Sequence, residues 1–324
     1  NVFAGRERLD LARWPNKRAN GHDDFTGMIL SISEDERSMT LLSPLAKRVN
    51  KYHNRDDMRM FGYYRYDWSA SDGPVLDYDP ATGFITPTVN HYGIHRTQEP
   101  YCPFPYFYFY NIPDELDSPD EYYIDKNTAT LYVMDPSEDY TIGMYDSAIR
   151  IDGADHLTFR GLCFAYSTGH AINAPAANHI LFDRCSFRDV YRYGVEIRGD
   201  HIEFRGCEFY EIGFRGIDML TGDRETLTKG DSVIDNCLFD HFGTVQKTGM
   251  PAIYVQGCGI TISHNEICHS SNIGIIYSEY IWASNYITIE YNYIHDVVTQ
   301  SSDSGAIYAG RNLAGYGSVI RYNL

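Results

Sequence analysis

Two segments of the chain, HILFDRCSFRDVYRYGVE (residues 179–196) and HIEFRGCEFYEIGFRGID (residues 201–218), share one pattern with an offset of 22 residues. Each contains a cysteine, Cys185 or Cys207, with one phenylalanine three residues before it and another two residues after it. Apolar and polar residues alternate along both segments, which is typical of half-buried β-strands. The two segments therefore predict a repeated unit built from short strands and turns.

The same pattern recurs from residue 149 to the end of the chain, and we call the place of the cysteine the ladder position. The ladder positions are 22 to 31 residues apart. They are occupied by Leu162, Cys185, Cys207, Cys237, Asn265, Asn292 and Asn323. A period near 22 with strand-like alternation predicts one coil of a β-solenoid, because helical repeats are longer and follow a 3.6-residue period.

Stacking of coils places each ladder position on its equivalent in the next coil. The three cysteines of this column are predicted to form a buried stack, and the three asparagines to continue it as a hydrogen-bonded ladder. Parallel connections strongly favour a right hand. The sequence thus predicts an all-β fold with a right-handed parallel β-helix over residues 149–324. These cysteines are structural in this interpretation, and with no CxxC pair we expect neither a zinc site nor a disulfide framework.

Residues 1–148 do not repeat, and they contain strand-like segments separated by turns. One of them, DEYYIDKNTATLYVMDP (residues 120–136), predicts a hairpin around residues 125–128. We expect a mostly β cap or side region over residues 1–148, packed on the first coils. Because the chain begins at Asn1 and stops within a repeat, we also expect it to be part of a longer protein.

The charge balance limits the class of partner. The net charge is −17, which disfavours nucleic acid and anionic membranes, since both require a basic surface. No apolar run is long enough to predict a transmembrane helix. The 28 tyrosines suit sugar rings as well as β-strands, because tyrosine has a flat apolar face and a hydroxyl group.

Several coils are lengthened by insertions, which in a solenoid commonly form the binding face. These segments are residues 219–233, 241–252, 277–289 and 295–305. The last one lies within YIHDVVTQSSDSGAIYAG (residues 293–310) and carries Asp296 and Asp303. Asp296 falls in a column four residues after the ladder position, and Asp303 lies at the far end of the insertion.

Two carboxylates, many aromatic residues and no recognisable metal motif are typical of glycoside hydrolysis. One carboxylic acid protonates the leaving oxygen, while the other attacks the anomeric carbon or activates water. Their proximity also separates the two pKa values and so assigns the roles. The alternative is that Asp296 and Asp303 only cap turns, for which SSDSG is suitable.

Further residues are substrate-binding candidates on position alone. They are Glu196, Asp218, His241, Tyr254, His269, Tyr277, Tyr308 and Arg311. Glu196 and Asp218 are expected to point outward, because their neighbours point inward. Structural roles are the alternative for the others: turn-end bonding for the two histidines, ion pairing for Arg311, and packing of Tyr277 and Tyr308 in the inward column that contains Ile197.

The segments at residues 293–310 and 317–323 (GSVIRYN) resemble the catalytic coil of glycoside hydrolase family 136, bacterial lacto-N-biosidases with a right-handed β-helix. LARWPN (11–16), GYYRYDW (62–68) and residues 120–136 resemble the region that precedes the helix in that family. These three motifs are also similar to other β-helix glycosidase families. The resemblance spans essentially the whole chain, and its most specific element is the seven-residue spacing of the aspartates.

The resemblance implies release of lacto-N-biose (Gal-β1,3-GlcNAc) from lacto-N-tetraose, a human milk oligosaccharide, with retention of configuration. Asp296 would then be the general acid/base and Asp303 the nucleophile. It also implies a gut bacterium, an extracellular or cell-surface location, and a helical folding partner, supplied as a chaperone or an N-terminal domain. No cofactor is expected; calcium is associated with some members, but the chain has no calcium-loop motif.

Three other functions stay open at this point. A β-helix glycosidase of xylosidase-like or fucosidase-like specificity would use the same pair of aspartates. A polysaccharide lyase acting on uronates requires Lys or Arg to neutralise the substrate, and the repeat contains only Lys229 and Lys247 as lysines. A non-catalytic carbohydrate-binding solenoid would explain the fold and the tyrosines, but not an aspartate pair on an insertion.

Overall fold

The computed structural model describes residues 1–96, 105–134, 139–279, 284–310 and 315–324. The chain divides into two compact units, Val2–Ile142 and Gly143–Leu324, with Asn1 grouped with the second. The repeat alone predicts a boundary at residue 148. Among the described residues, no helix is long and apolar enough to cross a membrane.

The first unit is built from antiparallel and mixed sheets, as its strand-like segments predict. A three-stranded sheet contains β1 (Val2–Ala4), β2 (Glu7–Arg8) and β13 (Tyr140–Ile142). A seven-stranded sheet contains β4 (Arg13–Trp14), β10 (Tyr106–Tyr110), β7 (Arg59–Tyr66), β8 (Ser69–Asp79), β9 (Phe84–Pro87), β6 (Met39–Leu41) and β5 (Ile29–Ile32). A third sheet contains β12 (Thr130–Val133), β11 (Glu121–Asp125) and β3 (Asp10–Leu11). The short helix α1 (Ser43–Val49) buries Leu45 and Val49, and a 3-10 turn spans Pro113–Glu115.

The predicted hairpin at residues 125–128 is confirmed. Strands β11 and β12 pair antiparallel, from Asp125 opposite Thr130 to Tyr122 opposite Val133. The carboxylate of Asp125 accepts hydrogen bonds from the Asn127 N–H and the Thr128 hydroxyl, each at 2.8 Å. A carboxylate that binds donors two and three residues later holds a tight turn closed.

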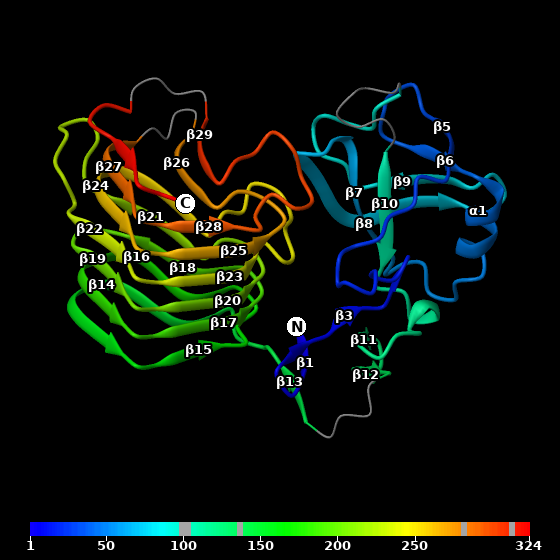
Figure 1. Cartoon of the computed structure of the whole chain (residues 1–324). Coiled ribbons are helices and arrows are strands. Elements are labelled where there is room, and N and C mark those ends of the chain that lie inside the picture. Colours follow the sequence, from blue (N-terminus) through cyan, green and yellow to red (C-terminus); the bar gives the residue numbers. More distant parts are fainter. Residues whose placement is uncertain (97–104, 135–138, 280–283, 311–314) are drawn as a thin grey trace. The chain divides into compact units, whose positions relative to one another are not determined.

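The second unit is a parallel β-helix with three faces, and Figure 1 shows the strands of face C as successive rungs from β15 to β28. Face A contains β18 (Tyr193–Arg198), β21 (Ile217–Thr221), β26 (Ile275–Glu279), β29 (Ile307–Gly310) and the first parts of β14 (Ser147–Arg160), β16 (His170–Asp183) and β24 (Ile253–Ser263). Face B contains the second parts of those three strands with β19 (Ile202–Arg205), β22 (Ser232–Asp235), β27 (Ser284–Glu290) and β30 (Val319–Arg321). Face C contains β15 (Cys163–Ala165), β17 (Ser186–Val190), β20 (Glu208–Ile212), β23 (Leu238–Phe242), β25 (Glu266–Ser270) and β28 (Tyr293–His295).

Pairing in register confirms the predicted alignment of the coils. Phe187, Phe209 and Phe239 lie opposite one another on face C, and their ring centroids are 4.6 and 4.5 Å apart. This separation is close to the spacing between hydrogen-bonded strands, so the rings stack wherever the same aromatic residue recurs. The interior of the helix is therefore a set of like-on-like columns rather than an irregular core.

The ladder column is confirmed, and thiols and amides make the same contacts in it. The thiol of Cys207 donates to the carbonyl of Phe182 in the preceding coil, at 3.4 Å. The side-chain amide of Asn265 donates to the corresponding carbonyl of Ile234, at 3.0 Å, and its Oδ1 accepts the N–H of Cys237 at 2.9 Å. Asparagine thus replaces cysteine in the later coils with the same bonding pattern and with shorter hydrogen bonds.

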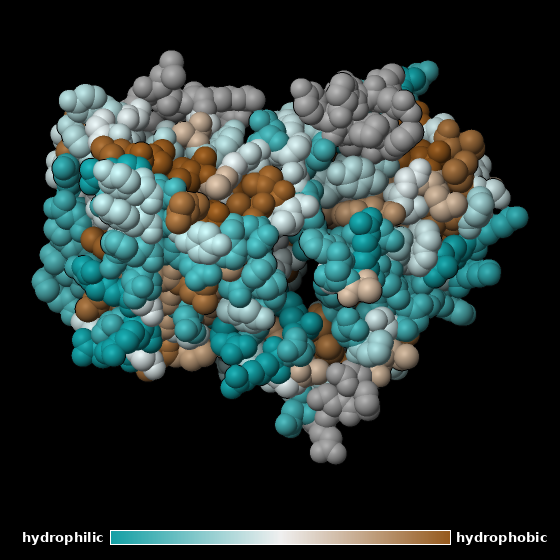
Figure 2. Space-filling model, in the orientation of Figure 1, coloured by the Kyte–Doolittle hydropathy of each residue, from teal (hydrophilic) through white to brown (hydrophobic). Residues whose placement is uncertain are grey.

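Each coil turns at corners where one residue adopts a left-handed backbone. The corner between faces B and C lies directly before the ladder position. Its members are Gly161, Arg184, Gly206, Asn236, His264, Tyr291 and Tyr322, with φ between 50° and 62°. Glycine, asparagine and histidine are among the residues that tolerate this region best. The last described coil exposes Val319, Ile320 and Leu324, and Figure 2 shows apolar surface gathered there on the solenoid.

Candidate active site

Asp296 occupies the corner that turns the chain from face C to face A. The sequence aligns six residues at this corner, and all of them have a left-handed backbone. They are Tyr166, Asp189, Glu211, His241, His269 and Asp296, with φ between 49° and 64°. The side chain of Asp296 is 66% exposed. The predicted column is confirmed, and its polar character suits a corner, because Asp and His are enriched in this conformation.

The segment Ser270–Asn272, which follows the preceding corner, holds the insertion that carries Asp296. The N–H of Ser270 donates to the Asp296 carbonyl at 3.1 Å. The Ser270 carbonyl accepts bonds from the N–H and the hydroxyl of Thr299, at 3.1 and 2.9 Å. The Val298 N–H donates to the Asn272 carbonyl at 2.9 Å. The insertion is therefore bonded, residue by residue, to the adjacent coil.

Asn272 connects two insertions through its side chain, which is buried. Its Nδ2 donates to the hydroxyl of Ser301 and, at 3.0 Å, to the hydroxyl of Ser304. Its Oδ1 accepts the N–H of Gly249, from the insertion at residues 241–252, at 3.0 Å. Because Ser301 and Ser304 stand on either side of Asp303, one short segment anchors the chain beside both predicted catalytic aspartates.

Asp303 lies at the exposed part of the insertion. It also has a left-handed backbone, with φ of 48°. Its side chain is exposed, and within the described residues its carboxylate forms no ion pair. The strand β29 begins at Ile307, shortly after it, as the sequence predicts.

Histidine, rather than a second carboxylate, sets the electrostatics of Asp296. Nδ1 of His295 lies 2.8 Å from Oδ2 of Asp296, and Nε2 of His295 lies 3.3 Å from Oε1 of Glu266. The hydrogen bond from His295 lowers the pKa of Asp296, and the same bond raises the pKa of His295. The sequence predicts that the two aspartates separate each other's pKa values; in the structure, His295 and His269 are the charged neighbours that lower the Asp296 pKa.

The two predicted substrate-binding histidines, His241 and His269, are bonded to one carboxylate oxygen. Their Nδ1 atoms lie 2.7 and 2.6 Å from Oδ1 of Asp240. This is the turn-end bonding that the sequence offers as their structural role. The buried thiol of Cys268 lies beside them, and burial together with Asp240 raises its pKa to about 12.

Four of the predicted residues form an outward column on face A together with Ile276. Glu196, Asp218, Tyr254, Ile276 and Tyr308 follow one another in register on successive strands. Tyr254, Ile273, Ile276 and Tyr308 pack together outside the main core. The guanidinium of Arg215 lies 3.8 Å from the centre of the Tyr254 ring. This column thus has an acidic part and an apolar, aromatic part.

The two carboxylates of this column point outward, as predicted, but both are paired. Arg198 contacts Glu196 at 3.1 Å and Asp218 at 2.9 Å, and Arg215 also contacts Asp218. His170 binds the other oxygen of Glu196 at 2.8 Å. Asp218 is buried beneath these arginines, so it is held as an ion-paired carboxylate rather than open to a ligand.

One alignment within the predicted set is wrong. Tyr277 packs against the interior core, in agreement with the inward column. Tyr308 pairs with Ile276 instead of Tyr277, and a register irregularity follows that pair. Because a shift of one residue moves a side chain to the opposite face of a strand, Tyr308 belongs to the outward column. Arg311 lies outside the described residues, as does part of the insertion at residues 277–289.

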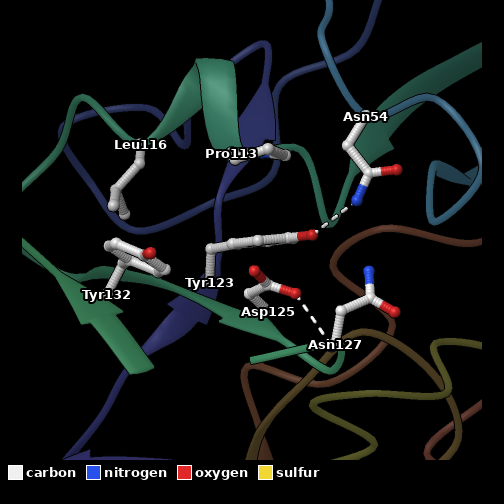
Figure 3. Close-up of a pocket in the computed structure, with 7 residues that line it drawn as sticks. All are labelled: Asn54, Pro113, Leu116, Tyr123, Asp125, Asn127 and Tyr132. Carbon is white, nitrogen blue, oxygen red and sulfur yellow. Dashed lines mark hydrogen bonds between the residues drawn. The ribbon is translucent and has the colours of Figure 1, made fainter. Parts of the chain in front are cut away.

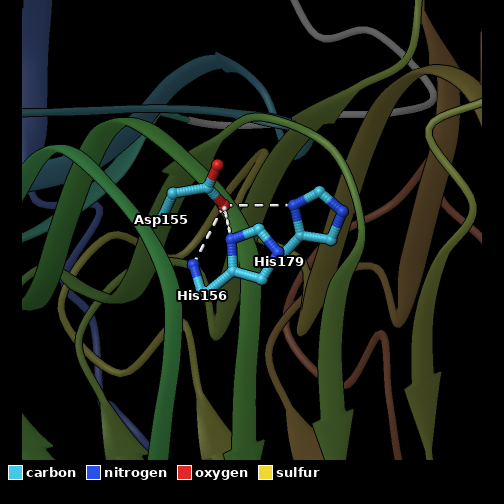
Figure 4. Close-up of side chains that lie close together, drawn as sticks. All are labelled: Asp155, His156 and His179. Atoms are coloured by element: carbon cyan, nitrogen blue, oxygen red, sulfur yellow. Dashed lines mark hydrogen bonds and ion pairs between the residues drawn. The ribbon is translucent and has the colours of Figure 1, made fainter.

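Two clusters outside the predicted site contain groups suited to ligands. At the corner between faces A and B, Oδ1 of Asp155 lies 3.1 Å from Nδ1 of His156 and 3.0 Å from Nδ1 of His179 (Figure 4). All three of these side chains are exposed. In the first unit, Tyr123, Tyr132, Leu116, Asn54 and other residues line a cavity of about 390 Å³ (Figure 3). None of the residues predicted to be functional lies in either cluster.

Sequence reasoning missed Asn272, and it missed Asp240, Cys268 and His295, which lie beside the predicted His241, His269 and Asp296. Asn272 belongs to SSN (residues 270–272), which carries no catalytic motif, and its role depends on two insertions that meet at it. The cluster around Cys268 comes from DH, CH and HD pairs at residues 240–241, 268–269 and 295–296. These pairs lie at matching places in three coils, so an alignment of the coils contains the signal.

Comparison with known proteins identifies the fold. The family model of the right handed beta helix region matches residues 170–323. The fold is a right-handed parallel β-helix. A solved structure named "Glycoside hydrolase" is similar at a TM-score of 0.77 and 15% sequence identity, over 100% of this chain and 68% of that one. No curated protein matches the sequence. The predicted hand and fold class are thereby confirmed.

Proposed function

We propose that this chain is a retaining glycoside hydrolase in which Asp296 is the general acid/base and Asp303 the nucleophile. The observation that carries the proposal is the anchoring of residues next to both aspartates to Ser270–Asn272, through backbone groups near Asp296 and serine hydroxyls near Asp303. A catalytic pair requires such support, because misplacement by about 1 Å can cost about 100-fold in rate. The similar solved structure is named as a glycoside hydrolase, which agrees with this reaction class.

In this mechanism Asp303 attacks the anomeric carbon and forms a covalent glycosyl-enzyme. Asp296 donates a proton to the departing oxygen, and then takes a proton from the water that hydrolyses the intermediate. Retention requires carboxyl groups about 5 to 5.5 Å apart. Because His295 lowers the pKa of Asp296, the acid role requires bound substrate to exclude water from Asp296 or to break its contact with His295.

The proposed substrate is an oligosaccharide of the lacto-N-tetraose type, with lacto-N-biose as the released disaccharide. This choice rests on the resemblance of residues 293–310 and 317–323 to family 136. A neutral substrate fits the surface, because Arg198 and Arg215 on face A are both engaged by carboxylates. That pairing weighs against a uronate-specific lyase. An extracellular or cell-surface location and a helical folding partner belong to the same proposal.

Product analysis tests the substrate. The full chain, expressed with a helical chaperone if it needs one, should release a disaccharide from lacto-N-tetraose but not from lacto-N-neotetraose, which differs in the linkage of its terminal galactose. Cleavage of a different glycoside would agree with the catalytic role of the two aspartates and would contradict the proposed substrate. Binding of glycans without any cleavage would favour the non-catalytic solenoid.

Substitution of the aspartates tests the mechanism. Asp303→Asn should reduce kcat/KM on the order of 10⁴-fold or more, and Asp296→Asn by about 10²- to 10⁴-fold. Glu211→Gln is the matched control, because Glu211 occupies the same corner in a coil that has no insertion directly after this corner. Azide should rescue Asp296→Ala with retained configuration and Asp303→Ala with inverted configuration. Full activity of Asp303→Asn would contradict the mechanism.

A further inference from the structure

Six side chains with metal-binding chemistry lie at one end of face C, from three adjacent strands. Asp240, Cys268 and His295 pair in register on β23, β25 and β28. The corner residue that follows each of them is polar as well. These corner residues are His241, His269 and Asp296. A parallel β-helix places residues from consecutive coils about 4.8 Å apart, so a thiol, imidazoles and carboxylates converge here although they are far apart in the sequence.

The atoms at the centre of this array already contact one oxygen. Around Oδ1 of Asp240, Nδ1 of His269 lies at 2.6 Å, Nδ1 of His241 at 2.7 Å and Sγ of Cys268 at 3.7 Å. The candidate ligand atoms of Asp240, Cys268 and His269 all lie within 4.8 Å of one another. Cys268 is buried, whereas the two histidines are exposed enough to admit an ion from solvent.

We propose that Asp240, His241, Cys268 and His269 form a binding site for a thiophilic divalent cation, with zinc as the preferred ion. Thiolate, imidazole and carboxylate are the ligands that zinc takes in proteins, usually four in a tetrahedron. At the usual bond lengths, tetrahedral zinc separates a sulfur ligand from an oxygen ligand by about 3.6 Å, which is close to the 3.7 Å between Cys268 and Asp240. The His269 imidazole would move off the carboxylate oxygen by less than about 1 Å to reach tetrahedral spacing. His241 lies outside the set of ligand atoms within 4.8 Å of one another, so it would move further to become the fourth ligand.

Two further candidate ligands, Glu266 and His295, lie next to the proposed metal site. Glu266 and His295 form a second set with Cys268, in which the candidate ligand atoms also lie within 4.8 Å of one another. His295 in turn binds Asp296. His295 would therefore lie between a cation bound to Cys268 and Asp296, the proposed acid/base. The ion binds with loss of the Cys268 thiol proton to solvent. Each imidazole donates from Nδ1 to Asp240 before binding, so its proton transfers through solvent to Nε2 when Nδ1 becomes a ligand.

The cluster in Figure 4 is the competing site within the described residues. Asp155, His156 and His179 offer a carboxylate and two imidazoles, but no thiol. Its side chains are all exposed, so binding there would be weaker and would show no sulfur signature. The exposed Cys163 is another source of a thiolate signal. Variants of this cluster and of Cys163 therefore serve as controls.

Cobalt(II) titration of the metal-stripped full chain tests the site. We expect one equivalent of cobalt to produce a thiolate-to-cobalt charge-transfer band and intense visible bands of tetrahedral geometry, and zinc to displace it. Cys268→Ser should abolish the charge-transfer band and weaken zinc binding by more than about 100-fold, beyond the effect of a change outside the ligand set. Cys163→Ser and His179→Ala should leave the charge-transfer band and the zinc affinity unchanged.

His269→Ala provides a second variant at an exposed position, in case Cys268→Ser disturbs folding, and it should weaken zinc binding to a similar degree. Asp303→Asn should bind zinc normally. The proposed zinc site is therefore tested independently of the proposed hydrolase activity. The proposal is overturned if cobalt gives no charge-transfer band, if the band survives in Cys268→Ser, or if it disappears in His179→Ala.

Discussion

The early and the late coils of the β-helix have the same three faces but differ in their interior residues and in the position of their insertions. From Leu162 to Cys237 the interior columns are rich in phenylalanine and cysteine, and only one segment, residues 219–233, is lengthened. From His241 onward the columns contain isoleucine and asparagine, and the insertions at residues 241–252 and 295–305 follow the corner between faces C and A. The early coils thus provide stability by stacking, whereas the later ones combine the same faces with hydrogen-bonded loops that carry the candidate catalytic groups.

The largest expected effect is on stability in the early coils. Phe209→Ala should lower the free energy of unfolding by about 3 to 5 kcal/mol, because Phe209 is buried and stacks on Phe187 and Phe239. Denaturant unfolding measures this loss, and the activity per folded molecule should stay unchanged. A loss below about 1 kcal/mol would mean that the stack relaxes around the gap, and would contradict the assignment of stability to this column.

The second effect concerns activity in the late coils. Asn272→Ala should reduce kcat/KM of the proposed hydrolase by about 100-fold, mainly through kcat, since both insertions lose their common anchor. Arg192→Ala is the matched control, because Arg192 stands at the equivalent place three residues after an earlier corner. Unchanged kinetics in Asn272→Ala would show that the insertions hold the aspartates without this amide.

The smallest effect compares the two halves of the ladder column. Asn292→Ala should cost about 2 to 3 kcal/mol, because it leaves buried N–H and carbonyl groups without partners, among them the Ile262 carbonyl and the Asn265 N–H. Cys207→Ala should cost about 1 kcal/mol, since a thiol makes weaker hydrogen bonds and its loss leaves a small gap. Equilibrium unfolding of the two variants measures the difference, and equal costs would contradict a stronger amide ladder.

Most of the fold could be predicted because each coil of a solenoid repeats the same sequence pattern. The spacing of Cys185 and Cys207, with the flanking phenylalanines, gives the coil length, and the pairing between these two coils follows it without a shift. The prediction failed locally at Tyr308, which pairs with Ile276 rather than with Tyr277 and therefore lies on the opposite face of the strand. Alignment of sequence columns cannot detect a one-residue shift of this kind when the loops that precede the strands differ in length.

The candidate site was only half visible in the sequence. The position of Asp296 in a corner column follows from the repeat, and so does the location of Asp303 on an insertion. The partners of these residues do not follow from it. His295 was not among the predicted residues, yet its hydrogen bond lowers the pKa of Asp296, and Glu196 and Asp218 turned out to be engaged by arginines. Side-chain pairing between coils depends on rotamers and loop paths, which a periodic pattern does not encode.

By itself, the sequence determined the solenoid, its coil length, its ladder of thiols and amides, and the places where the coils are interrupted. Short-range alternation and a constant period suffice for these, because identical residues stack at a fixed strand spacing. Only the tertiary structure decided that Asn272 connects two insertions, that His295 reaches Glu266, and that Asp240, Cys268 and His269 meet at one corner. The contacts of Asn272 join residues 23 to 32 positions apart, and they form only once the coils close on one another.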